Sequence, residues 1–211
     1  MKPSPKLLTP DDHALVLIDY EGQMAFATKS ISITELRTNV SIIAGASRIF
    51  KIPTIITTVA EKSFAGPVFP EIEEFYPKAS SGYIDRTSMN TWEDENAYKA
   101  IKALSKPKLV LAGLWTSVCI VGPVLSAIAE GGQEIYIVTD ACGDVSTEAH
   151  ERAIVRMTNA GATPLTSIQY LLELQRDWAR ASTYAPLMSL MKKYGGSYGV
   201  GIDYAENMLK H

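Results

Sequence analysis

The sequence is poor in the residues that build disulfide frameworks and metal sites. Its 211 residues include two cysteines and three histidines, and no Cys-x-x-Cys pair is present. Two cysteines in a chain of this length do not form a disulfide framework. The amino-terminal residues also lack the apolar stretch of a signal peptide. We therefore predict a cytoplasmic protein with reduced thiols.

An excess of positive charge is also missing. The chain has 20 Lys and Arg residues against 23 Asp and Glu residues, which gives a formal net charge of −3. Proteins that bind nucleic acid usually carry a basic excess to contact phosphates, so we expect no nucleic-acid partner. The apolar share of 46% is enough for a sizeable core and excludes intrinsic disorder. The length fits a single domain over residues 1–211.

One uncharged stretch raises the possibility of a membrane segment. Residues 109–129 carry no charged side chain and are long enough to span a bilayer. Small and polar residues and a proline interrupt the stretch, at Gly113, Thr116, Ser117, Gly122 and Pro123. A buried strand followed by a buried helix explains the pattern better, and we expect no membrane partner.

The remaining pattern alternates short β-branched runs with helical stretches. The expected strands cover residues 14–19, 54–59, 83–86, 108–113, 134–140 and 162–166. The expected helices cover residues 34–50, 93–104, 117–130, 147–160 and 167–181, and residues 63–77 are expected to form a loop. Such alternation predicts an α/β fold: a three-layer α/β/α domain with a six-stranded parallel sheet and right-handed crossovers, Rossmann-like in outline.

The carboxyl-terminal tail, residues 180–211, departs from this alternation. It is rich in methionine and tyrosine, with apolar residues that include Tyr184, Met188, Leu190 and Met191. Apolar surface of this kind usually marks an interface, so we expect the tail to pack on the domain or on a neighbouring subunit. The glycine-rich segment 195–201 follows no strand and lacks the Lys-Ser/Thr ending of a phosphate loop, and we interpret it as a flexible turn.

Reactive side chains fall where several of the expected strands end, which is the functional edge of a parallel sheet. Asp19 ends the first strand, Arg86 ends the third, and Cys119 follows the fourth across GLWTSV. A thiol at the first turn of a helix and near a guanidinium gains thiolate character. Together the three side chains predict a site built on a reactive cysteine.

Each of these side chains alone has a structural explanation. A lone cysteine is most often buried in the core, a lone aspartate can cap a turn, and a lone arginine is usually solvated. Their joint placement favours the functional interpretation. Cys142 has no comparable partners, and we assign it a structural role. The histidines, at positions 13, 150 and 211, poorly support a Cys-His catalytic pair.

Four motifs carry a resemblance to a known family. They are ALVLIDYEGQM around Asp19, GYIDRTSMNTW around Arg86, AGLWTSVCIVGPVLSAIAEG around Cys119, and EIYIVTDACGD after the fifth expected strand. In these motifs the chain resembles the isochorismatase-like cysteine hydrolases, and it looks closest to their YcaC-like branch. The resemblance runs from about Leu7 to Asp177, and it implies the isochorismatase-like α/β fold.

The resemblance also implies roles for individual residues. The family triad is Asp, Lys and Cys, so Asp19 corresponds to the proton shuttle and Cys119 to the nucleophile. The family lysine falls on Arg86, which cannot give up its proton but can hold a thiolate by charge. Family members have a cis peptide that corresponds to Leu114–Trp115. It would direct the backbone N–H groups of Trp115 and Cys119 at one oxyanion.

Two departures from the family bear on the substrate. Many relatives have Gln two residues after the aspartate, where this chain has Glu21, so a second carboxylate is expected near the site. We assign substrate binding to Glu21 and Trp92. Nicotinamidases bind a metal through an Asp-x-His-x-x-His stretch after the second strand. This chain reads TTVAEKSFAGP there, so we expect no metal and no cofactor.

These observations predict a metal-free cysteine hydrolase for a small-molecule substrate. The expected substrate is amide-like or carbamoyl-like and reacts through a thioester intermediate. Two alternatives stay open: a catalytically inactive family member that acts as a scaffold or binding protein, and a thiol redox sensor that uses Cys119 and Cys142. The resemblance to the YcaC-like branch, whose members form octamers, implies a homo-oligomer larger than a dimer.

Overall fold

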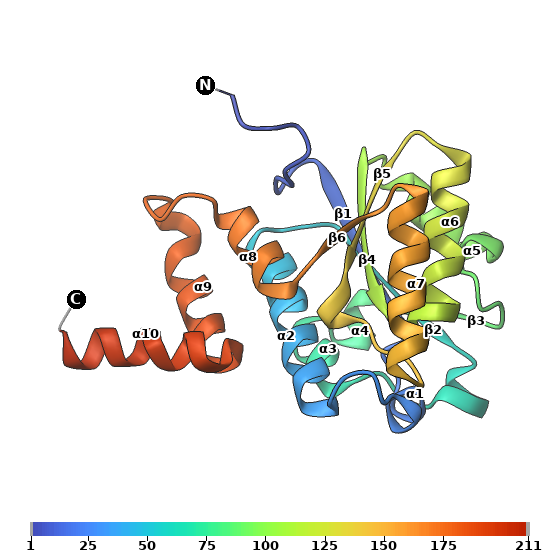
Figure 1. Ribbon diagram of the computed structural model, residues 1–211, viewed down its shortest axis with the longest axis horizontal. Coiled ribbons are helices and arrows are strands. Elements are labelled where there is room, and N and C mark those ends of the chain that lie inside the picture. The colour runs from blue at the N-terminus through green and yellow to red at the C-terminus, as the bar shows by residue number, and fades with distance from the viewer. Residues whose placement is uncertain (1, 210–211) are drawn as a thin grey trace.

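The computed structural model describes residues 2–209 and is built around one six-stranded sheet (Figure 1). The strand order is β3-β2-β1-β4-β5-β6, and every neighbouring pair is parallel. The strands are β1 His13–Ile18, β2 Thr54–Val59, β3 Ile84–Arg86, β4 Lys108–Gly113, β5 Glu134–Val138 and β6 Thr163–Leu165. The predicted α/β class and six-stranded parallel sheet are confirmed.

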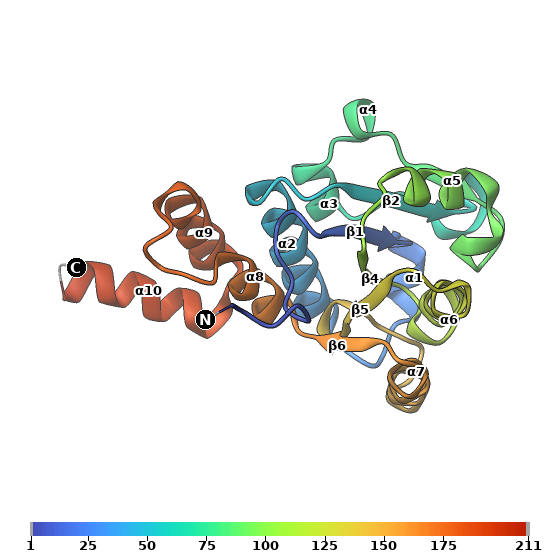
Figure 2. The same cartoon turned by 90° about the horizontal axis from the view of Figure 1, so that it is seen from above.

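Helices cover both faces of the sheet, as Figure 2 shows. The helices are α1 Gly22–Ala27, α2 Ile33–Ile49, α3 Pro70–Phe75, α4 Lys78–Ser81, α5 Glu95–Ala103, α6 Val121–Glu130, α7 Thr147–Ala160, α8 Ser167–Gln175, α9 Ala181–Tyr194 and α10 Gly196–Met208. Four single turns are η1 Glu61–Ala65, η2 Thr91–Glu93, η3 Thr116–Ile120 and η4 Thr139–Ala141. Helices α2, α3 and α8 lie on one face, and α5, α6 and α7 lie on the other.

The two central strands explain why the sheet needs both helix layers. All six residues of β1 and all six of β4 are buried. A strand buried on both faces reads as a continuous apolar run, which is what HALVLI and KLVLAG show after their first residue. The core therefore lies on both sides of β1 and β4, and the edges where these strands begin and end are fixed in position.

Two expected segments differ from the structure. Residues 63–77, expected as a loop, include part of η1 and all of α3, because Pro70 opens a helical turn at its first position. The helix expected over 167–181 ends at Gln175, where Arg176 adopts a left-handed φ of 57°. Asp177 and Arg180 then connect α8 to a separate helix, α9.

In the glycine-rich segment 195–201, Gly195 separates α9 from α10 and residues 196–201 are helical, so the interpretation of the segment as a flexible turn is wrong. It opens α10, and its glycines permit close packing on α9. A Cβ atom on Gly195 would lie 2.5 Å from the Met191 carbonyl oxygen, and one on Gly199 would lie 2.3 Å from that same atom. The glycines therefore allow the two helices to approach each other closely, and the sequence pattern does not show this contact.

Helix α10 extends away from the sheet and packs against α9, which in turn packs against α2 (Figure 1). Its exposed apolar side chains include Tyr198, Val200, Tyr204 and Met208. None of the helices within residues 2–209 combines the length and apolar character that crossing a bilayer requires. The uncharged stretch 109–129 divides among β4, η3 and α6, as expected of a buried strand and helix.

Candidate active site

The ends of β1 and β4 approach each other unusually closely at the carboxyl edge of the sheet. Ile18 and Gly113 are register partners, and the Leu114 N–H donates to the Ile18 carbonyl oxygen at 3.0 Å. A Cβ atom on Gly113 would lie 2.0 Å from that oxygen. A glycine is therefore required here, and it brings the segments that carry Asp19 and Cys119 side by side.

Asp19 is held in a conformation that residues other than glycine rarely adopt. Its φ is 56°, in the left-handed region. Its N–H donates to the Thr57 carbonyl oxygen at 3.1 Å, and its own carbonyl accepts from the Glu21 N–H at 2.8 Å. Backbone strain of this kind persists where surrounding contacts enforce it, and it concentrates at functional sites.

The Asp19 carboxylate forms a buried ion pair with Arg86. Arg86 Nη2 lies 2.6 Å from Asp19 Oδ2, and both side chains are completely buried. Thr57 Oγ1 donates to Asp19 Oδ1 at 3.3 Å, and Arg86 Nη1 donates to the Ser88 carbonyl. Burial raises the pKa of Asp19 to about 6, although the Arg86 charge and hydrogen bonds from Cys119, Arg86 and Thr57 oppose the rise. Asp19 is thus mostly ionised at neutral pH and able to accept a proton.

Cys119 lies in η3, one turn before α6, and only 3% of it is exposed. Its thiol lies close enough to Asp19 and Arg86 for both charges to act on it, so the structure brings together the three predicted side chains. The expectation of an acidic thiol is wrong. Burial and then the Asp19 charge raise the pKa of Cys119 to about 12, and Arg86 offsets only part of this. Because the guanidinium is bound to Asp19, the resting cysteine is a neutral thiol.

The segment before Cys119 has the features expected of an oxyanion site. The Leu114–Trp115 peptide bond is cis. No acceptor for the Trp115 backbone N–H occurs among the described residues. The Trp115 indole Nε1 donates to the Met24 carbonyl at 3.0 Å and contacts Thr28 Oγ1 at 3.2 Å, which fixes the ring against α1.

Three side chains that support this segment were missed by sequence reasoning. Thr116 Oγ1 donates to the Gly143 carbonyl at 3.1 Å and lies 2.8 Å from His150 Nδ1. Asp144 Oδ2 accepts from the Ser117 N–H at 2.6 Å. Thr116 and Asp144 fall inside the quoted motifs, but nothing in their spacing shows that they meet. They hold the turn that carries the thiol.

The two residues assigned to substrate binding lie in different places. Glu21 is completely buried at the carboxyl edge, where its Oε2 accepts from the Val59 N–H at 2.9 Å and its Oε1 has no partner. The Trp92 indole instead donates to Glu130 Oε2 at 2.8 Å and stacks edge-on against Tyr98. Glu130 ends α6, whereas Cys119 precedes it, so the structure does not bring Trp92 into the site.

The second cysteine is separate from this group of side chains. Cys142 is a free, buried thiol, and burial raises its pKa to about 12. Within residues 2–209 no group of three His, Cys, Asp or Glu side chains is arranged to hold a metal ion. The predicted side chains that meet at this edge are a thiol, a carboxylate and a guanidinium.

Comparison with known proteins identifies the family. The family model for the isochorismatase domain matches residues 13–169. The chain belongs to the isochorismatase family. Asp19, Arg86 and Cys119 all lie inside the matched region of this isochorismatase domain.

Individual relatives agree with this assignment. The chain is 35% identical over 172 residues to the probable hydrolase YcaC of Escherichia coli, covering 81% of each chain. The crystal structure of Escherichia coli YcaC, an octameric hydrolase of unknown specificity, matches with a TM-score of 0.90 at 32% identity, covering 99% of this chain and 100% of that one. Pseudomonas aeruginosa YcaC with hexane-2,5-diol and covalent acrylamide matches with a TM-score of 0.88 at 32% identity, covering 96% and 98%. The chain is thus an isochorismatase-family hydrolase.

Proposed function

We propose that this protein is a metal-free cysteine hydrolase that cleaves a small amide-like or carbamoyl-like substrate through a thioester. The observation that carries the proposal is the buried Asp19–Arg86 pair beside the Cys119 thiol, whose pKa both charges affect. A carboxylate that is ionised at neutral pH and touches a thiol can serve as its general base.

Proton transfer and bond formation occur together in the first step. The pKa of Asp19 is about 6 and that of Cys119 about 12, so the thiolate is unfavourable before attack. The Asp19 carboxylate takes the proton as Cys119 Sγ attacks the substrate carbonyl carbon. The carbonyl oxygen becomes an oxyanion, which the backbone N–H groups of Trp115 and Cys119 stabilise.

The second half of the reaction returns the enzyme to its starting state. The tetrahedral intermediate expels the amine, which takes the proton from Asp19 and leaves a thioester on Cys119. Water then attacks the thioester carbon and gives a proton to Asp19. The carboxylic acid product leaves, and the Cys119 sulfur recovers the proton from Asp19. Arg86 lowers the pKa of Asp19 by its charge and exchanges no proton itself.

A relative supports this substrate class. The Pseudomonas aeruginosa YcaC structure holds covalent acrylamide, a small molecule with an amide group. That protein matches this chain over nearly its whole length. A protein of this fold therefore accommodates a covalently attached small molecule that bears an amide group.

A library of small amides, carbamoyl compounds and esters tests the proposal. Wild type and Cys119→Ala are assayed side by side, with Cys142→Ala as the matched control for loss of the other buried thiol. We expect hydrolysis by wild type and Cys142→Ala and none by Cys119→Ala, with a transient acyl adduct of Cys119 in mass spectra. Hydrolysis that survives in Cys119→Ala would refute the thioester mechanism. No hydrolysis by any form would favour the scaffold alternative.

We also propose that the chain forms a homo-oligomer larger than a dimer. The supporting observation is α10, which packs on α9 and carries exposed Tyr198, Val200, Tyr204 and Met208. The octameric Escherichia coli relative is matched over its entire length, so its chain extends equally far. Light scattering is expected to give a multiple of the 23.0 kDa chain mass that falls when residues 195–211 are deleted. A wild-type mass near 23.0 kDa would contradict the proposal.

A further inference from the structure

Glu21 has one polar atom that the protein leaves without a partner, and that atom is buried. Its backbone N–H donates to the Asp19 carbonyl at 2.8 Å, and its carbonyl accepts from the Ala25 N–H at 3.2 Å. Side-chain Oε2 accepts from the Val59 N–H at 2.9 Å. Only Oε1 lacks a hydrogen bond, although the residue is 0% exposed.

The charges around Glu21 oppose its ionisation. The charged groups with the largest effect on its carboxyl are Asp19 after β1, Asp85 in β3 and Glu61 in η1, all of them acidic, and the η1 turn also contains Lys62. Neither α1 nor the segment 66–69, which pairs with Glu21 through Val68, contains a charged residue. The nearby guanidinium of Arg86 is bound to Asp19 and to the Ser88 carbonyl. Burial and these carboxylates raise the pKa of Glu21 to about 8.

A protonated carboxyl group accepts through one oxygen and donates through the other. Because Oε2 accepts from Val59, the proton belongs on Oε1. A buried donor without an acceptor costs about 1–3 kcal/mol, so a ligand that supplies the acceptor recovers this energy on binding. Arg86 Nε, on the residue that pairs with Asp19, is also buried without a partner. Two residues whose charges or contacts affect Asp19 therefore each have a buried polar atom without a partner.

We propose that Glu21 is a specificity-determining residue that presents a neutral O–H at Oε1 to the substrate and selects small uncharged molecules bearing a hydrogen-bond acceptor. This inference rests on the proposed function and adds the substrate feature that the site recognises. Glu21 does not take part in the covalent steps.

Infrared spectroscopy tests the proton directly. We expect wild type at pH 6 to show the C=O stretch of a protonated carboxylic acid that disappears in Glu21→Gln and that fades as the pH rises past about 8. Glu74→Gln is the matched control, because Glu74 pairs with Lys193 and Tyr194 far from the sheet edge, and it should keep the band. A wild-type spectrum in which no such band depends on Glu21 would overturn the inference.

Alkylation of Cys119 tests recognition. Acrylamide offers a carbonyl acceptor, whereas iodoethane offers none. We expect Glu21→Leu to slow alkylation by acrylamide about tenfold or more relative to iodoethane, and Glu21→Gln, which keeps a neutral N–H donor, to recover most of that loss. Equal slowing for both reagents, or no slowing, would overturn the recognition role. If Glu21→Leu fails to fold, judged by its thermal melt, the Glu21→Gln rates and the infrared band decide.

The same experiments separate this inference from the proposed function. The infrared band depends on Glu21 alone and is expected to persist in Cys119→Ala. Hydrolysis that survives in Cys119→Ala would refute the cysteine mechanism while the band remains. Loss of the band with a normal Cys119 dependence would refute the role of Glu21 only.

Discussion

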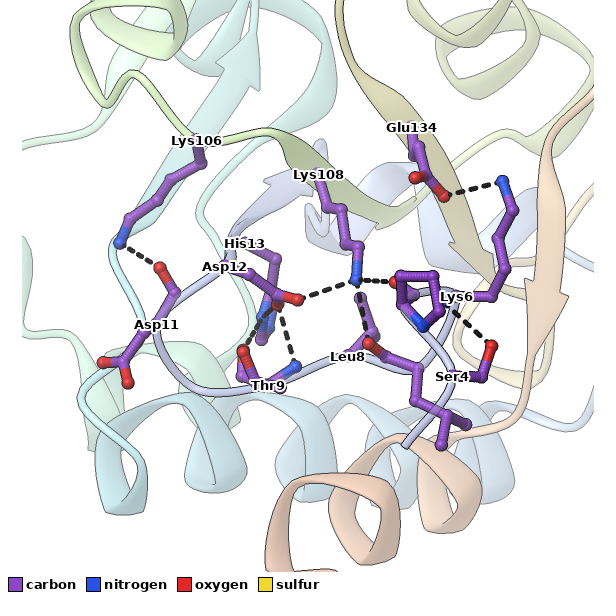
Figure 3. Close-up of polar contacts among 12 residues, drawn as sticks. Ser4, Lys6, Leu8, Thr9, Asp11, Asp12, His13, Lys106, Lys108 and Glu134 are labelled. Atoms are coloured by element: carbon purple, nitrogen blue, oxygen red, sulfur yellow. Dashed lines mark hydrogen bonds and ion pairs between the residues drawn. The ribbon is translucent and has the colours of Figure 1, made fainter. Parts of the chain in front are cut away.

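Each edge of the sheet contains a pair of a cation and a carboxylate, and the two pairs differ in burial and in how fully their hydrogen bonds are satisfied. Arg86 and Asp19 are completely buried, whereas the Asp12 side chain is 25% exposed. At the amino edge, Lys108 Nζ lies 2.7 Å from Asp12 Oδ2 and donates to the carbonyls of Pro5 at 2.6 Å and Leu7 at 2.8 Å (Figure 3). A lysine has three donors, so this ammonium is saturated. The Thr9 N–H also donates to Asp12 Oδ1 at 2.8 Å.

The corresponding pair at the carboxyl edge is not fully hydrogen-bonded. Arg86 Nη2 and Asp19 Oδ2 are 2.6 Å apart, but Arg86 Nε and the neighbouring Glu21 Oε1 have no hydrogen-bond partner. The pKa of Asp19 is raised to about 6 by burial, whereas hydrogen bonds from Lys108 and Thr9 outweigh burial and lower the pKa of Asp12. A saturated pair stabilises the fold, and an unsaturated pair is available to a substrate.

The largest contrast is expected between Asp19→Asn and Asp12→Asn. Asp19→Asn removes the proton acceptor for Cys119, so hydrolysis of the best library substrate should fall by about 10³-fold. Asp12→Asn lies at the opposite edge and should leave kcat/KM within about twofold while it lowers the melting temperature. Steady-state kinetics and thermal melts check both. An active Asp19→Asn would remove the general base from the mechanism.

Replacing either cationic residue by methionine removes the positive charge but keeps a side chain of similar length. Lys108→Met leaves Asp12 and two carbonyls without their donor and should reduce the free energy of unfolding by about 2–4 kcal/mol. Arg86→Met should lower activity by about 100-fold, because loss of the guanidinium raises the pKa of Asp19 above 6.

Arg86→Lys is the control for this pair, since it restores a positive charge and should recover much of the activity. The pH dependence of kcat/KM reports the pKa of Asp19 in each form. An unchanged pH profile in Arg86→Met would show that Arg86 does not act on the general base.

The close approach of β1 and β4 predicts an intolerant glycine at the carboxyl edge. Gly113→Ala would place Cβ 2.0 Å from the Ile18 backbone oxygen, so we expect a loss of about 2–3 kcal/mol in unfolding free energy and a loss of hydrolysis. Gly201→Ala in α10 is the control, since its Cβ meets nothing within 4 Å and alanine favours helix. Urea unfolding measures both. A stable, active Gly113→Ala would show that the two strand ends can separate.

The smallest expected effect concerns how the free energy of unfolding changes with pH. The contributions of Glu21 and Asp12, at the two edges, should change in opposite directions as the pH rises. The folded pKa of Glu21 is raised from 4.5 to about 8, so its contribution is present below pH 4.5 and is lost as the pH rises to about 8. Glu21→Gln should flatten this decline. The folded pKa of Asp12 is lowered from 3.8, so its contribution is present above pH 3.8 and is lost as the pH falls.

Denaturant unfolding across this pH range distinguishes the two carboxyls. Asp12→Asn should lose stability at neutral pH and differ least from wild type in acid. Parallel curves for wild type and Glu21→Gln would contradict a neutral Glu21.

Local sequence patterns were sufficient to predict the sheet and the three side chains that meet at its edge. Continuous apolar runs define β1 and β4, and parallel strands place Asp19, Arg86 and Cys119 at one edge whatever the details of the loops. The elements that failed depend on contacts that no local sequence pattern shows. The glycines at the start of α10 are required by their close approach to Met191. The Trp92 indole donates a hydrogen bond to Glu130 instead of lying in the site.

The protonation states also could not be predicted from the sequence. Helix position and a nearby arginine suggested an acidic thiol at Cys119, but complete burial and the Asp19 charge reverse the direction of the pKa shift. The partners of Glu21 come from Val59, Glu61 and Asp85, which follow it by many residues. These pKa shifts depend on which charged groups are buried near one another, and the fold determines which groups those are.

The central position of β4 governs how the molecule opens. All six of its residues are buried, and it is hydrogen-bonded to β1 on one side and β5 on the other. Backbone amides in such a strand exchange with solvent only when the whole domain unfolds, whereas α10, which rests on α9, can open locally. Lys108 begins β4, and Cys119 follows its end by six residues. The amino-terminal segment and the turn that carries Cys119 are therefore attached to the part of the protein that we expect to lose its structure last.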